Sequence, residues 1–131
     1  MTNFPTDLRY HSHHLWVRPG GEHLVLIGVS DFAQQELGDV VAVTLPAVGE
    51  KITVGNPCGN IESTKSVSDL VAPVSGTIRK QNEALAAAPE LVNTAPYGDG
   101  WLFEVELDAS SERDQLAGLL DAAAYRHLVG D

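Results

Sequence analysis

Turn-forming residues divide this chain into short segments, and this division limits the fold more than any other feature of the sequence. Proline and glycine gather at residues 19–21, 46–49, 55–57, 73–76 and 96–100. The segments between these turns are mostly of strand length and rich in β-branched residues, which favour β-strands. Short strands separated by such turns predict an all-β sandwich or flattened barrel with peripheral helices.

Two segments carry the strand pattern most clearly. Residues 24–29 form a continuous apolar run of strand length, which indicates a buried strand. In residues 103–107, apolar side chains alternate with Glu104 and Glu106. This alternation indicates a strand that has one face in the core and the other in water.

Helices are predicted at two places. Ser30-Asp31 offers an N-cap and Gly38 a natural stop, so we expect a short helix near residues 31–37. A C-terminal helical segment is expected to start after Ser110 or Ser111, where acidic residues follow and the helix dipole favours them. We expect this segment to break in two near Asp121.

Composition limits the classes of function. The chain has 131 residues, the length of one domain, and we assign residues 1–131 to a single domain. Its 18 acidic residues against 8 lysines and arginines give a formal net charge of −10. This charge argues against binding to nucleic acids or to anionic membrane surfaces, and it suits contact with basic patches on partner proteins. We expect a monomer.

Two further features bear on the compartment. No apolar run approaches membrane-spanning length, and residues 1–7 carry no basic-then-apolar leader pattern. Cys58 is the only cysteine, so no disulfide can form within the chain. We expect Cys58 to be a small core residue rather than a reactive thiol, and we expect the protein to be cytoplasmic. The mature form of an organellar protein, with its leader removed, would show the same sequence features.

Three histidines within four residues, His11, His13 and His14, invite a metal hypothesis. Structural zinc sites usually draw their ligands from two separated clusters, commonly with cysteines. The sequence contains no second cluster. We therefore interpret these residues as exposed histidines near a strand and predict no metal.

A single lysine stands in a predicted hairpin near the middle of the chain. The polar stretch at residues 62–69 lies between two short apolar segments, which predicts strand, tight turn and strand, with Lys65 in the turn. Glu62 and Asp69 flank it. A lone lysine in a hairpin is more often a solvated surface group, so the hairpin pattern alone assigns it no function.

The residues of the whole stretch, taken together, indicate more than the hairpin pattern does. Glu62-Ser63-Thr64-Lys65-Ser66-Val67-Ser68-Asp69, followed by Ala72-Pro73-Val74-Ser75-Gly76, resembles the lipoylation hairpin of the glycine cleavage system H-protein family. The resemblance extends from about Leu8 to Val129, and its other matching stretches include residues 28–34, 37–41, 45–49, 82–85, 89–93 and 96–101. It implies a mainly β, lipoyl/biotinyl-carrier-like flattened barrel-sandwich of two small antiparallel sheets.

The resemblance also implies a function. Lys65 would carry lipoate as an amide, and the protein would be a non-catalytic lipoyl carrier that shuttles the aminomethyl group of glycine. Its partners would be a pyridoxal-phosphate glycine decarboxylase, a tetrahydrofolate-dependent aminomethyltransferase, dihydrolipoyl dehydrogenase and a lipoate-attaching enzyme. Glu62 and Asp69 would serve recognition by the attaching enzyme or the cleft in which the arm rests.

One position departs from the family. A glutamate usually stands immediately before the tryptophan that corresponds to Trp16, and this chain has Leu15 there. In the family that carboxylate belongs to the cleft that shelters the loaded arm, and its loss leaves Asp69 as the matching acid near the lysine. An H-like paralogue that acts mainly as an intermediate in lipoate transfer is therefore an alternative. A biotinyl carrier and an unmodified interaction protein of the same fold are two others.

Overall fold

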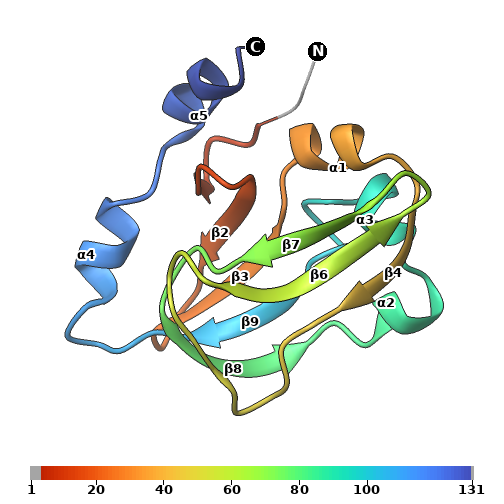
Figure 1. Ribbon diagram of the computed structural model, residues 1–131. Coiled ribbons are helices and arrows are strands. Elements are labelled where there is room, and N and C mark those ends of the chain that lie inside the picture. The colour runs from red at the N-terminus through yellow and green to blue at the C-terminus, as the bar shows by residue number, and fades with distance from the viewer. Residues whose placement is uncertain (1–3, 131) are drawn as a thin grey trace.

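Two antiparallel sheets, one in front of the other, form the body of the protein in a computed structural model that describes residues 4–130 (Figure 1). In spatial order the larger sheet contains β1 (Arg9–Tyr10), β2 (Leu15–Pro19), β3 (Leu24–Val29), β9 (Phe103–Glu106), β8 (Gly76–Gln81) and β5 (Lys51–Ile52). The smaller sheet contains β4 (Val40–Thr44), β6 (Pro57–Ser63) and β7 (Val67–Val71). Residues 1–3 of the N-terminal stretch and Asp131 lie outside the described part.

The predicted mainly β fold with two antiparallel sheets is confirmed. The sheets are unequal, with six and three strands, and over the described residues neither closes into a barrel. The apolar run at residues 24–29 forms β3, and the alternating segment forms β9. Phe103, Val105 and Leu107 are buried while Glu104 and Glu106 are half-buried, as the alternation predicts.

The main core lies between the two sheets and consists of aliphatic and aromatic side chains from both. Its fully buried members include Ile27, Ile61, Val74, Ile78, Leu102 and Phe103. Each buried side chain of this size contributes about 1.5–3 kcal/mol relative to an exposed one, so this layer fixes how the smaller sheet sits on the larger. The β6–β7 hairpin is therefore held in a fixed position by the core beneath it.

A second core lies against the C-terminal helix. The rings of Tyr10 and Tyr125 stack 4.7 Å apart, and Phe4 meets Tyr125 edge-on at 5.1 Å. Trp16 lies across Gly28, its partner on the next strand, where an added Cβ would come within 2.3 Å of the indole. Glycine is required there because no larger side chain leaves room for the tryptophan.

The part of the chain that the structure describes contains five helices: α1 (Asp31–Leu37), α2 (Ala84–Ala87), α3 (Leu91–Thr94), α4 (Glu112–Ala117) and α5 (Ala122–Val129). The helix predicted at residues 31–37 is confirmed, and its N-cap is Ser30, whose hydroxyl oxygen accepts from the amide of Ala33 at 3.1 Å. The predicted break near Asp121 is also confirmed, because Asp121 caps α5 by accepting from the amide of Ala124 at 2.8 Å. Ser111 precedes α4, but its side chain makes no capping bond.

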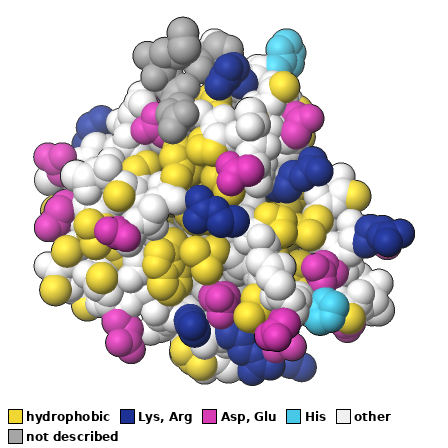
Figure 2. Space-filling view, turned by 180° about the vertical axis from the view of Figure 1, so that it is seen from behind, with side chains coloured by type: hydrophobic (Ala, Val, Ile, Leu, Met, Phe, Trp, Pro, Cys, Tyr) yellow, Lys and Arg dark blue, Asp and Glu magenta, His cyan; other side chains and the backbone are white. Residues whose placement is uncertain are grey.

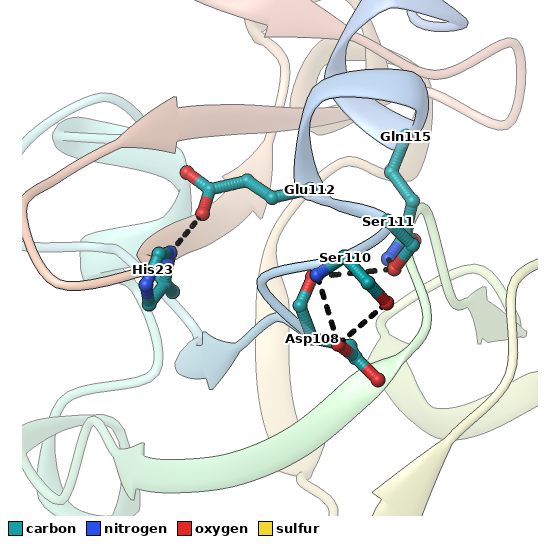
Figure 3. A network of polar contacts seen from close by, with 6 residues as sticks. All are labelled: His23, Asp108, Ser110, Ser111, Glu112 and Gln115. Carbon is teal, nitrogen blue, oxygen red and sulfur yellow. Dashed lines mark hydrogen bonds and ion pairs between the residues drawn. The ribbon is translucent and has the colours of Figure 1, made fainter.

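Polar contacts attach α4 to the larger sheet (Figure 3). Glu112, the first residue of α4, pairs with His23 in the turn before β3. Asp108 accepts from both the amide and the hydroxyl of Ser110 and so shapes the connection from β9. The amide of Ser75, on the turn before β8, donates to Gln115 at 2.7 Å, which adds a second tie between α4 and the strands.

The face opposite the β6–β7 hairpin carries charges of both signs. Figure 2 shows lysine and arginine side chains interspersed there with aspartate and glutamate, and with apolar patches between them. This face presents no field of a single sign to a charged partner. Separately, none of the helices in residues 4–130 has the length and apolar character needed to cross a membrane.

Candidate functional site

The turn that carries Lys65 is held by one buried side chain. The Ser63 hydroxyl oxygen accepts from the amides of Lys65 and Ser66, each at 3.2 Å, and the Ser63 hydroxyl donates to the carbonyl of Ser66. The amide of Ser63 also donates to the Ser66 carbonyl at 2.8 Å. The backbone of the turn is therefore formed in advance, while the Lys65 side chain is exposed, as predicted.

Two contacts attach the hairpin to the end of α1. The amide of Thr64 donates to the carbonyl of Asp39 at 3.0 Å. The Lys65 stem lies against Gly38, because a Cβ built on Gly38 would lie 3.2 Å from Lys65 Cε. Gly38 has φ of +76°, a conformation that side chains rarely adopt, so glycine serves both the turn and the contact.

Asn93 of α3 fixes the segment that joins α1 to β4, against which the Lys65 stem lies. Its amide group donates to the carbonyl of Gly38 at 2.7 Å, and its carbonyl oxygen accepts from the amide of Val40 at 2.9 Å. One side chain thus satisfies backbone groups on both sides of the turn from α1 to β4. Such polar contacts hold a backbone segment in one conformation.

A cleft of about 420 Å³ opens beside the hairpin, between α1, β7 and the start of β2. Its apolar lining comes from Leu15, Phe32, Ala33, Leu37, Ile61 and Leu70. Its polar lining comes from His13, His14, Glu36, Ser66, Ser68 and Asp69. An apolar interior with a few polar groups at the edge is typical of sites that hold small organic groups.

The predicted site residues do not all lie together. Lys65 is at the tip of the hairpin and Asp69 lines the cleft, but Glu62 is exposed and is not part of the lining. Leu15, which stands where the family has glutamate, is buried and faces the cleft. The structure adds Glu36, which the sequence analysis did not single out. Its spacing of four from Phe32, which indicates a shared helical face, was the available signal.

His14 belongs to a hydrogen-bonded group that joins the segment before β2 to the C-terminal helix. Its Nδ1 lies 2.7 Å from the hydroxyl of Tyr125, which also bonds the hydroxyl of Ser30 at 2.7 Å. Burial lowers the pKa of His14, the nearby His13 lowers it further, and Glu36 acts in the opposite direction. His14 is therefore neutral at pH 7. Among residues 4–130, no three histidine, cysteine or carboxylate side chains come together as a metal would require.

Two open antiparallel sheets with an exposed lysine at a hairpin tip fit the carrier-like fold that the sequence predicts. The family model of the glycine cleavage H-protein matches residues 8–131. Glycine cleavage system H proteins of Mycobacterium avium and Mycobacterium tuberculosis are 52% and 47% identical, each aligned over 96% of both chains. A crystal structure of the protein of that name from Mycobacterium marinum has a TM-score of 0.87 at 40% identity and covers 98% of this chain and 100% of its own.

The chain belongs to the glycine cleavage H-protein family. Members of this family are lipoyl carriers of glycine cleavage rather than catalysts, and membership implies the other components of that system as partners. The predicted carrier-like fold is confirmed by the similarity to the solved H protein.

Proposed function

We propose that Lys65 is the residue to which lipoate is attached. The observation that carries this proposal is the position of Lys65, alone and exposed at the tip of a turn that Ser63 holds, beside a cleft large enough to receive part of an arm. The amide bond would remove the charge of the lysine. The apolar lining of the cleft fits a hydrocarbon arm and its sulfur atoms, and the rim carboxylates fit a cationic cargo.

Lipoate, when attached, supplies a disulfide that accepts and releases the aminomethyl group and is reoxidised afterwards. The work of this chain is to present Lys65, to shelter the loaded end in the cleft and to expose it to each partner in turn. The partners would be the pyridoxal-phosphate glycine decarboxylase, the tetrahydrofolate-dependent aminomethyltransferase and dihydrolipoyl dehydrogenase. A lipoate-attaching enzyme would recognise the hairpin, with Glu62 and Asp69 on either side of its lysine. We place this monomeric, single-domain carrier in the cytoplasm.

The test has two stages. The protein is expressed with a source of lipoate, and its intact mass and peptide masses are measured; a lipoyl increment on Lys65 supports the proposal, while a biotinyl increment or none overturns it. The modified protein is then combined with the other three components, and glycine-dependent release of carbon dioxide is followed.

A second candidate function rests on Leu15. Because the cleft lacks the carboxylate that the family has at this position, the chain could serve mainly as an intermediate in lipoate transfer. Lipoylation of Lys65 without carbon dioxide release in the reconstituted system, together with passage of the lipoyl group to another carrier domain, would favour this function over glycine cleavage.

A further inference from the structure

Two carboxylate residues line the cleft, from two different elements. Glu36 lies on α1, and Asp69 lies on β7 of the lysine hairpin. Within residues 4–130, neither side chain has a hydrogen-bond or ion-pair partner, so both are available to a ligand. Between them the lining is apolar and includes Leu15.

Helix geometry directs Glu36 to the cleft. Phe32, Ala33 and Glu36 are spaced by three and four residues, so they share one face of α1, and all three line the cleft. Gln35 points elsewhere, since its amide donates to the carboxylate of Asp31 at 3.2 Å. The charge of Glu36 also acts across the cleft, where it opposes the lowering of the pKa of His14.

The attachment point lies at the same end of α1. The stem of Lys65 lies against Gly38, two residues beyond Glu36. A chain that continues from Lys65 therefore starts beside the last turn of α1. To enter the cleft, such a chain would turn back between α1 and β7. Ser66 and Asp69 of the lysine hairpin line the cleft on the β7 side.

We propose that Glu36 is the carboxylate that holds the cationic amine carried on the Lys65 arm, in the place that Leu15 leaves without a charge. This inference rests on the proposed function. The ligand chemistry is a small primary ammonium group at the end of an apolar arm. His14 is neutral at pH 7 and so adds no opposing charge beside it.

The consequence is chemical protection. An aminomethyl thioether decomposes when the lone pair of its neutral nitrogen expels sulfur as a thiolate: the carbon–sulfur bond breaks and a carbon–nitrogen double bond forms. Water then adds to that double bond and yields formaldehyde and ammonia. A nearby carboxylate favours the protonated amine, whose lone pair is not available. Glu36 therefore slows the loss of the cargo.

The test compares lipoylated proteins that the decarboxylase has loaded and that have then been separated from it. Glu36→Gln should release ammonia about twofold to fivefold faster than the unchanged protein, the range expected for an ion pair open to solvent. Glu83→Gln makes the same charge change on an exposed residue outside this cleft and should leave the rate unchanged. Adding Leu15→Glu to Glu36→Gln should restore slow release.

A second measurement does not depend on turnover. The carboxyl carbon resonance of Glu36, in protein labelled with carbon-13, should shift when the lipoyl arm is loaded, while that of Glu83 should not. Equal release rates for Glu36→Gln and Glu83→Gln would overturn the role of Glu36. So would a result in which Asp69→Asn releases ammonia faster than the unchanged protein and Glu36→Gln does not. Absence of a lipoyl group on Lys65, or failure of the unchanged protein to accept cargo, would instead overturn the proposed function, and the inference with it.

Discussion

Lys65 and Gly38 lie in contact, with the lysine stem resting on the glycine at the end of α1. The contact is close, since a Cβ on residue 38 would lie 3.2 Å from Lys65 Cε, and the backbone of Gly38 has φ of +76° and ψ of −157°. A conformation in this region costs any other residue about 1–3 kcal/mol. The sequence around the helix end and the position of the lysine are therefore linked.

Gly38→Ala should lower the free energy of unfolding by about 1–3 kcal/mol because of this conformation. It should also displace the Lys65 stem, since a Cβ would lie 3.2 Å from Cε, and so slow lipoylation. Denaturant unfolding and a time course of lipoylation measure the two effects. Gly21→Ala is the matched control, because Gly21 has open space around it and no positive φ. Equal stability of the two variants would contradict the prediction.

Lys65→Arg should abolish lipoylation while the fold survives. The side chain is exposed, and such substitutions usually change stability by less than about 0.5 kcal/mol. Intact mass and thermal unfolding of the variant test both parts. A lipoyl group found on any other lysine of the variant would show that Lys65 is the wrong residue.

Joint replacement of Glu62 by Gln and Asp69 by Asn should slow the attachment of lipoate. Charges around an interaction site act mainly on the rate of association, and salt screens them. The slowing should therefore be greater at low ionic strength. Rates of modification at several salt concentrations provide the measurement, and rates that stay equal to those of the unchanged protein throughout would remove the idea.

Acid should destabilise the protein through two half-buried histidines. Burial lowers the pKa values of His11 and His14, with a further lowering from the neighbouring histidines. The unfolded chain therefore binds protons more readily than the folded protein as the pH falls below about 6.5, and stability is lost in that direction. His14→Asn, which suits the φ of +73° at this position, should flatten the pH dependence of the unfolding free energy below about pH 6.5. An unchanged slope would contradict this prediction.

Cys58 should be a slow nucleophile. Burial raises the pKa of its thiol to about 11, and Glu50 adds to the increase. Because only the thiolate reacts, alkylation near neutral pH should be on the order of a hundred times slower than for a free thiol of ordinary pKa. Mass spectrometry during treatment with iodoacetamide provides the test, and guanidinium-unfolded protein is the control. Equal rates in the folded and unfolded states would refute it.

Local sequence patterns predicted strands and helices, whereas the positions of the site residues relative to one another depend on packing between distant parts of the chain. The strand at residues 103–107 follows from its own alternation, and the lysine turn follows from its flanking residues. The contact of His14 with Tyr125 joins positions 111 residues apart, so no local pattern could reveal it. Glu36 was missed for a similar reason. Its helical face is readable from the sequence, but the strand opposite it, β7, is placed by the packing of the two sheets.

The two hydrogen bonds that the Asn93 side chain makes to the backbone have a consequence for the proposed arm. By holding both sides of the turn between α1 and β4, this residue makes one wall of the cleft and the base of the lysine hairpin parts of the same rigid frame. The distance from the attachment point to the cleft is then constant. For an arm attached at Lys65, the effective concentration of its end in the cleft would then depend on the length and stiffness of the arm. Asn93 thus keeps constant the geometry on which the sheltering of such an arm would depend.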